Sequence, residues 1–202
     1  MKYWIEDIVK NEFVIIKLLR YHEKDNHSVD YSILNKLELI EFKGYKSKKR
    51  QLEYYYTRVL WQMFNIKDLI NYRPTGKPII DQGHISISHS HNCIAIAYSK
   101  TNELGLDIEY FSEKIRKVKH KFLHPKENYT DLVDLTKAWC IKEAVYKLMD
   151  MDDAFFMDDI CIPSLKGRVK PEIWIKDNCI KTEVEILALP NKMMLAYAYQ
   201  KK

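Results

Sequence analysis

Apolar and polar residues alternate with a period of two along much of the stretch between His84 and Tyr110. The runs ISIS and CIAIAYS lie on either side of the polar letters SHSHN, and the run GLDIEY follows a few residues later. Such alternation is typical of β-strands, in which successive side chains point to opposite faces of a sheet. The stretch therefore predicts three short strands, with a tight connection at 88–92 between the first two.

Two other stretches have the three- and four-residue apolar spacing of a helix, one from Lys46 to Phe64 and a clearer one from Leu132 to Met149. After Asp150 the β-rich runs ICI, EIWI, TEVEILAL and MMLAYAY predict an antiparallel meander. The segment 71–81, with two prolines and a glycine, is expected to be a loop. Each half thus has a long helix and several strands, and IAIAYS and MLAYAY are candidates for equivalent closing strands.

Composition limits the class of protein. Hydrophobic residues make up 47% of the 202 positions, enough for a packed core in one large domain or in two small, tightly packed ones. The formal charge of +5 is mildly basic and fits phosphate-bearing or acidic partners without pointing to nucleic acid. The cationic run KGYKSKKR at 43–50 is either a solvated helix start or a binding surface. A rival hypothesis, a nucleic-acid-binding domain using this run and YYYTR, predicts steeply salt-dependent binding.

Cysteine usage and hydropathy bear on the compartment. The four cysteines form no CxxC pair and no metal-ligand spacing, so buried free thiols in a reducing cytosol are expected. The first residues, MKYWIEDIVKNEF, lack the apolar region of a signal peptide. No apolar run approaches the ~20 residues needed to span a bilayer. We therefore expect a soluble, cytoplasmic protein without membrane association.

Two pairs of charged residues are candidates for chemistry. Asp107 and Glu109 lie two apart on a predicted strand, so both project to one face, and two neighbouring carboxylates repel each other unless a hard cation such as Mg2+ lies between them. Glu143 and Lys147 lie four apart and share one face of the predicted helix. Each pair also has an ordinary explanation, an exposed polar strand face for the first and a surface ion pair for the second.

Polar groups in two predicted loops are candidates for phosphate binding. Ser88 and His89 in the SHSHN run can donate hydrogen bonds to a phosphate, as can backbone amides of a tight turn. The His-x-His pair suggests a transition-metal site as an alternative, but no third ligand stands out. Lys77 in GKPII lies in a rigid loop shortly before this run and by itself is uninformative.

The order and spacing of these pieces resemble those of the Sfp-type 4′-phosphopantetheinyl transferases. That family has a GKP motif, an SHS motif after a strand, a G-[IVL]-D-[IV]-E motif and then W-x-x-K-E-[AS]-x-x-K. The chain reads GKP at 76–78, ISHS at 87–90, GLDIE at 105–109 and WCIKEAVYK at 139–147. FLHPKE at 122–127 is similar to the family's F-[FL]-x-x-x-E segment. The resemblance covers roughly residues 46 to 150.

The resemblance implies an α+β pseudodimer of two similar halves, each a small antiparallel sheet packed on a long helix. Residues 1–100 would bind coenzyme A, and residues 101–202 would be the magnesium-binding, catalytic half. The implied reaction transfers 4′-phosphopantetheine from coenzyme A to a serine of an apo carrier protein (acyl, peptidyl or aryl) and releases adenosine 3′,5′-bisphosphate. The alternative is a degenerate member that binds coenzyme A or a carrier without catalysis. A fused pseudodimer is expected to be a monomer.

The resemblance also implies roles for individual residues. Mg2+ would be held by Asp107, Glu109 and Glu143, with Glu143 as general base, directly or through a water. Lys147 would reach the pyrophosphate, and Asp107, Glu143 and Lys147 form the expected catalytic set. Coenzyme A would be held by Lys77, Ser88 and His89, with Lys142 lining the pantetheine arm or supporting the site.

Two further assignments concern the surface around this site. Lys49 and Arg50 are the preferred candidates for binding the 3′-phosphate of coenzyme A, and Lys46 and Arg58 are the other candidates. An acidic carrier helix would dock on the apolar residues Phe111, Ile115, Val118, Phe122 and Leu123. Core packing is the alternative explanation for those apolar residues.

Overall fold

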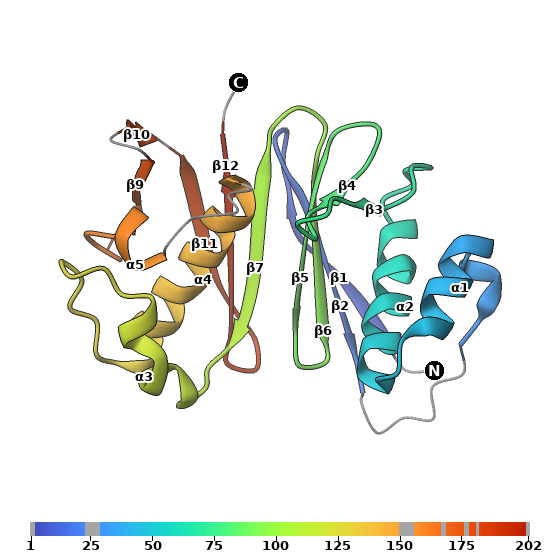
Figure 1. Cartoon of the computed structure of the whole chain (residues 1–202), viewed down its shortest axis with the longest axis horizontal. Helices are drawn as coiled ribbons and strands as arrows, with labels where there is room; N and C mark the ends of the chain where they lie inside the picture. The colour runs from blue at the N-terminus through green and yellow to red at the C-terminus, as the bar shows by residue number, and fades with distance from the viewer. Residues whose placement is uncertain are drawn as a thin grey trace.

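The chain has a mixed α+β fold with two main antiparallel sheets (Figure 1). The computed structural model describes residues 3–22, 29–149, 156–166, 169–175, 178–180 and 182–200. The first sheet has the order β1-β2-β6-β5, with bounds Tyr3–Lys10, Ile15–Tyr21, Cys93–Ser99 and His84–Ser90. The second has the order β11-β12-β7, with bounds Glu183–Leu189, Met193–Tyr199 and Leu104–Tyr110.

Helices cover the outer face of the first sheet. The helix α2 (Lys48–Gln62) is buried at every position from Leu52 to Trp61, and its tyrosines pack against Ile94 and Ile96 of β6. A shorter helix, α1 (Lys36–Gly44), begins with a capping box in which Asn35 and Glu38 satisfy each other's backbone N–H groups. Between α2 and β5 the chain forms a small hairpin of β3 (Asn71–Tyr72) and β4 (Pro78–Ile79).

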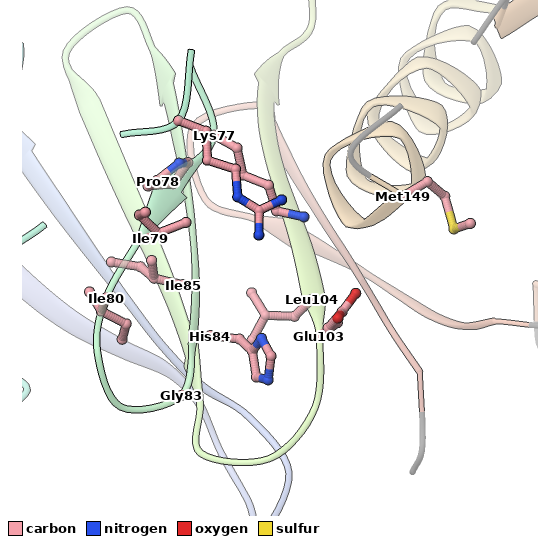
Figure 2. A pocket seen from close by; sticks show the side chains of 11 residues that line it. Lys77, Pro78, Ile79, Ile80, Gly83, His84, Ile85, Glu103, Leu104 and Met149 are labelled. Carbon is pink, nitrogen blue, oxygen red and sulfur yellow. The ribbon is translucent and has the colours of Figure 1, made fainter. Parts of the chain in front are cut away.

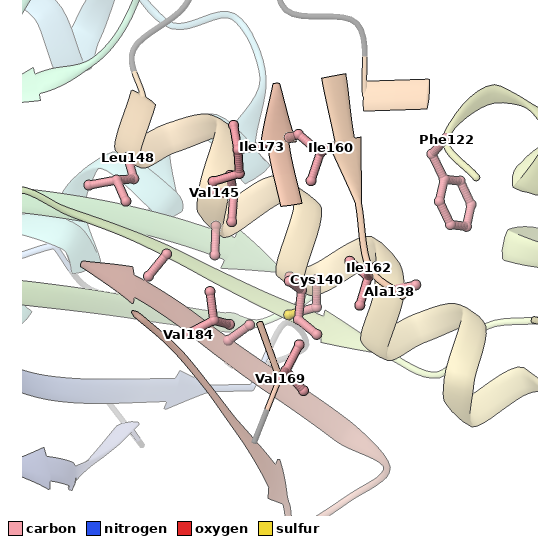
Figure 3. Close-up of a cluster of buried hydrophobic side chains, with 14 of the residues drawn as sticks. Phe122, Ala138, Cys140, Val145, Leu148, Ile160, Ile162, Val169, Ile173 and Val184 are labelled. Carbon is pink, nitrogen blue, oxygen red and sulfur yellow. The ribbon is translucent and has the colours of Figure 1, made fainter. Parts of the chain in front are cut away.

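The second sheet packs on α4 (Leu132–Met149), whose apolar side forms a core with the sheet and with a further small sheet (Figure 3). That small sheet has the order β10-β9-β8, with bounds Asn178–Ile180, Glu172–Ile175 and Ile160–Cys161. Two short elements, α3 (Lys114–Val118) and the 3-10 turn η2 (Lys119–Lys121), lead from β7 towards α4. The 3-10 turn η1 (Tyr31–Ile33) precedes α1, and α5 (Phe156–Asp159) precedes β8.

The helix α4 approaches β7 closely because Gly105 has no side chain. A Cβ added there would lie 1.9 Å from the carbonyl oxygen of Ala144 and 2.5 Å from the backbone nitrogen of Leu148. No other residue type fits in that space. The glycine of the GLDIE run therefore sets the distance between the strand that carries Asp107 and the helix that carries Lys147.

The two main sheets meet along β5 and β7, which lie side by side in Figure 1. Serine hydroxyls join these strands: Ser86 Oγ accepts a hydrogen bond from the backbone N–H of Leu106 at 2.9 Å, and Ser88 Oγ accepts one from Ile108 at 3.2 Å. Behind this seam, a buried apolar cluster combines residues of both sheets, including Leu18, Leu106 and Leu195. The halves therefore share one core.

Several sequence predictions are confirmed, and others are corrected. The α+β class and both long helices are present. The connection in the SHSHN run is only His91–Asn92, because Ser88, His89 and Ser90 belong to β5. The predicted meander is split, since β8, β9 and β10 form their own sheet while β11 and β12 join β7.

The predictions on the cysteines and on membrane-spanning segments can also be compared with the structure. All four cysteines are free, and three are buried as expected, but Cys179 is exposed. Among the helices that the structure describes, none has the length and apolar character needed to cross a membrane.

Candidate active site at the junction of the two sheets

Asp107 lies at the centre of the candidate site and is only 4% exposed. Its Oδ1 accepts hydrogen bonds from Lys147 Nζ at 2.7 Å and from Ser88 Oγ at 2.9 Å. Its Oδ2 is buried and has no hydrogen-bond partner. A buried carboxylate oxygen without a partner is costly in an apolar core, so this atom is available for a ligand.

Lys147 connects β5, β7 and α4. Besides Asp107, its ammonium group donates to the carbonyl oxygen of Leu106 at 3.1 Å and to Ser88 Oγ at 3.3 Å. Burial alone would lower the pKa of Lys147, but the ion pair with Asp107 and the charge of Glu143 raise it. The group is therefore a fixed cation at the junction of the sheets.

Glu109 lies on the same strand two residues beyond Asp107. Its Oε1 accepts from Trp139 Nε1 at 3.1 Å and its Oε2 from Ser90 Oγ at 3.2 Å. Burial, and then the neighbouring Asp107 carboxylate, raise the pKa of Glu109. The expected exposed polar strand face is thus wrong for this pair, because both carboxylates are held by hydrogen bonds inside the junction.

Glu143 lies one helical turn before Lys147 on α4. Burial, and then the negative charge of Asp107, raise its pKa to about 7, although Lys147 acts in the opposite direction. A carboxylate with a pKa near neutrality can both accept and release a proton under physiological conditions. Glu143 has the protonation behaviour required of a general base.

The structure brings the predicted metal ligands Asp107, Glu109 and Glu143 into one electrostatic group without arranging them around a cation. Within the described ranges, no three or more His, Cys, Asp or Glu residues are placed to hold a metal ion. Three carboxylates with hard oxygen donors nevertheless suit Mg2+, and the unpartnered Oδ2 of Asp107 offers it a ligand. The oxygen donors of these residues therefore fit this ion, whereas the present arrangement of the described side chains does not form a metal site.

A cavity of about 390 Å³ lies beside these residues, between α2, the β3–β4 hairpin and β5. Arg50, Arg58 and His89 line it, and three tyrosines contribute to its walls: Tyr45, Tyr54 and Tyr72. Arg58 is fixed by an ion pair with Glu38 at 3.0 Å, by the hydroxyl of Tyr72 at 3.2 Å and by the ring of Tyr54, whose centroid is 3.9 Å away. The cavity combines cationic and aromatic groups suited to a phosphorylated nucleotide.

His89 lies at this cavity with part of its side chain exposed. Its Nε2 is 3.0 Å from the hydroxyl of Thr57. Loss of hydration, followed by the charges of Lys147, Arg50, Arg58 and Lys49, lowers the pKa of His89 to about 4. The imidazole is thus neutral at pH 7 and acts as a hydrogen-bonding group rather than as a cation.

The other predicted 3′-phosphate ligands differ in their placement. Arg50 lines the cavity but also pairs with the buried Glu53 at 3.1 Å, and Lys49 Nζ lies 3.8 Å from the same carboxylate. Lys46 is exposed near the start of α2. Arg58, a secondary candidate from the sequence, is the cation that the structure holds most firmly at the cavity wall.

Lys77 faces a second, larger cavity of about 540 Å³ (Figure 2). This cavity lies between the β3–β4 hairpin, the first residues of β5 and β7, and the end of α4. Lys77 Nζ donates to the carbonyl oxygen of Leu148 at 3.4 Å. Its neighbour Pro78 lines both cavities, so the GKP segment separates them.

Two predicted coenzyme A ligands line neither of these two cavities. Ser88 is 4% exposed and points towards Asp107. Lys142 is fully buried, with its ammonium group bonded to the carbonyl oxygens of Phe122 and Ile160 and paired with Glu127 at 2.9 Å. The burial of Lys142 does not agree with the prediction that it lines the pantetheine arm, and its alternative role as a support of the site stays a prediction.

A shallow groove of about 190 Å³ opens next to Glu109, between β7, α3 and α4. Tyr110, Ile115, Val118 and Trp139 provide its apolar lining. Phe122, which the sequence placed on a carrier-docking surface, is completely buried in the core. For this residue the core-packing explanation is correct.

A scan of protein-family models gives no match to this sequence, and neither does a search of curated proteins.

Sequence reasoning missed the role of the serine row on β5. Ser86, Ser88 and Ser90 alternate along HISISHS, so all three lie on the strand face that meets β7. Their period of two was the available signal, but it indicates a polar strand face without saying what covers that face. Thr57, which contacts His89, carried no comparable signal because it is a single threonine in α2 and belongs to no repeating pattern.

Proposed function

We propose that this chain transfers 4′-phosphopantetheine from coenzyme A to a serine of an apo carrier protein. The single observation that carries the proposal is the arrangement of Asp107, Glu109, Glu143 and Lys147 at the junction of two sheets, beside a cationic and aromatic cavity. Phosphoryl transfer asks a protein mainly for positioning and for charge stabilisation. These residues supply both.

The strand orders support a pseudodimer with the fold of the Sfp-type transferases. In each main sheet the last strand in sequence lies between two others: β6 between β2 and β5, and β12 between β7 and β11. Each half also has its long helix, α2 or α4, packed on its sheet. We assign residues 1–100 and 101–202 to the two halves, with coenzyme A bound mainly by the first.

The nucleotide part of coenzyme A would occupy the cavity of about 390 Å³. Arg50 and Arg58 would pair with the 3′-phosphate, since guanidinium groups bind phosphate through paired hydrogen bonds. Neutral His89, whose one N–H donates to Thr57 Oγ1, would line the nucleotide site, and Lys147 would pair with the pyrophosphate. Ser88 would not contact coenzyme A itself but would hold Asp107 and Lys147 in place through hydrogen bonds.

Mg2+, when bound by Asp107, Glu109 and Glu143, would offset the negative charge of the pyrophosphate. Glu143 accepts the proton of the carrier serine, directly or through a water. The serine oxygen forms a bond to the β-phosphorus of coenzyme A while the bond from that phosphorus to the bridging oxygen breaks. The bonding electrons leave with adenosine 3′,5′-bisphosphate, and the phosphopantetheine remains on the carrier.

The carrier would dock on the groove beside Glu109. Lys114 lines this groove, and the segment 112–126 to which it belongs has six lysine and arginine residues and one glutamate. Oppositely charged surfaces speed association and orient the partners. An acidic carrier helix with an apolar residue for the groove fits this surface, and it brings the carrier serine towards Glu143.

Intact-mass spectrometry tests the proposal. Apo acyl, peptidyl and aryl carriers are each incubated with the protein, coenzyme A and Mg2+, and a gain of one phosphopantetheine is expected. Asp107→Ala and addition of EDTA should abolish the gain, whereas Glu185→Gln, at an exposed glutamate of β11, should not. Coenzyme A binding without transfer to any carrier would instead support the degenerate, non-catalytic binder.

A further inference from the structure

Tyr110 extends from the second sheet to three residues of the first. Its hydroxyl lies 3.1 Å from Cys93 Sγ, and Arg20 Nη1 is 3.5 Å from the same oxygen. The ring of His91 packs edge-on against the Tyr110 ring, with centroids 4.7 Å apart and an interplanar angle of 61°. Arg20 and Cys93 are both buried, so this side chain is held by a rigid part of the molecule.

His91 makes this contact from a backbone conformation that side chains other than glycine adopt rarely. It lies in the tight turn between β5 and β6 with φ of 52°, in the left-handed region that favours glycine. Glycine would fit this backbone without strain but would lack the ring that touches Tyr110. The second histidine of the SHSHN run, which coenzyme A binding does not require, thus has a structural partner across the junction.

The position of Tyr110 relates this contact to the proposed reaction. Tyr110 directly follows Glu109 and lines the groove proposed for the carrier. Two of the residues that hold it, His91 and Cys93, follow shortly after the end of β5, where His89 lies at the nucleotide cavity and Ser90 donates to Glu109. The end of β5 and the turn after it therefore contribute to the nucleotide cavity, fix a carboxylate and shape the groove wall.

We propose that Tyr110 is a specificity-determining residue for the carrier, and that His91, Cys93 and Arg20 are positioning residues that hold its ring as one wall of the groove. The inference rests on the proposed transfer reaction. The bound partner contacts Tyr110, whereas coenzyme A does not. A change that frees the Tyr110 ring weakens recognition of the carrier and leaves coenzyme A binding unchanged.

The test compares His91→Gly, Tyr110→Ala and Tyr110→Phe with a matched control. The control is Asn191→Gly, because Asn191 is exposed in the β11–β12 turn and also has a left-handed backbone, with φ of 64°. Steady-state kinetics with saturating coenzyme A give kcat and the KM for the carrier. Calorimetry gives the Kd for coenzyme A alone.

We expect His91→Gly to raise the carrier KM about two- to tenfold, as for the loss of one aromatic pair, with kcat and the coenzyme A Kd unchanged. Tyr110→Ala should raise the KM at least as much, and Tyr110→Phe, which keeps the ring, should raise it less. Asn191→Gly should have no effect.

If the wild type is active and both His91→Gly and Tyr110→Ala have the same carrier KM as the wild type, this inference is overturned and the proposed function is not. A weaker coenzyme A Kd that accompanies the higher KM also overturns it, since the turn would then serve the nucleotide. A wild type that binds coenzyme A but modifies no carrier overturns the proposed function, and this inference with it.

Discussion

Replacing Glu143 by glutamine is expected to make the protein more stable at alkaline pH while abolishing transfer. Burial, together with the charges of Asp107 and Glu109, raises the pKa of Glu143 from 4.5 to about 7 in the folded protein. A difference of that size corresponds to about 3 kcal/mol of free energy. The ionised carboxylate therefore destabilises the fold by up to this amount, and glutamine removes the charge.

The direction of the pH dependence follows from proton linkage. Between pH 4.5 and about 7 the folded protein keeps a proton on Glu143 that the unfolded chain releases. The stabilising contribution of this proton is complete below pH 4.5 and is lost as the pH rises through the folded pKa. Wild-type stability should fall across this window, whereas the Glu143→Gln variant lacks that part of the decline.

Urea unfolding at about pH 5 and about pH 8.5 measures the effect. The stability advantage of Glu143→Gln should grow by about 2 kcal/mol between these two pH values. Glu185→Gln serves as a control, because Glu185 is exposed and lies away from the junction. Mg2+ should stabilise the wild type at the higher pH more than it stabilises the variant. An advantage that does not change with pH, or a variant that is less stable at the higher pH, would refute the reasoning.

Three other substitutions test the framework around the site, all by urea unfolding. Gly105→Ala should destabilise the protein by at least about 3 kcal/mol, because its Cβ would overlap the backbone of α4. Lys142→Met should lower the free energy of unfolding by about 3–5 kcal/mol, because it leaves Glu127 charged in the core without its ion-pair partner. The protein that remains folded should bind coenzyme A as tightly as the wild type does. Ser88→Ala should cost about 1–3 kcal/mol, because it leaves the N–H of Ile108 without an acceptor.

The parts of the site that follow local periodicity could be predicted from the sequence. Asp107 and Glu109 share a strand face, and Glu143 and Lys147 share a helix face, whatever surrounds them. The prediction was less successful where a partner distant in sequence decides burial. Ser88 was predicted to bind phosphate, but β7 covers it, because strand order brings Asp107 beside it.

Lys142 shows the same difficulty on a helix. Its position next to Glu143 in sequence places it on another helix face, and helical geometry indicates that difference. The burial of Lys142 requires an ion-pair partner, and that partner, Glu127, lies in a segment whose sequence has no regular pattern. The N-terminal strands were also hard to predict, because β1 has a register shift between Asp7 and Val9 that interrupts its alternation.

Charge balance explains why the junction can hold so many ionisable groups. Three carboxylates, Asp107, Glu109 and Glu143, are accompanied by the ammonium group of Lys147, which pairs directly with Asp107. The fold tolerates this excess because Glu143 is partly protonated near pH 7. A cation bound by the three carboxylates would lower the pKa of Glu143 and release its proton. The same residue would then be ionised, and able to accept a proton from serine, only when the site is ready for transfer.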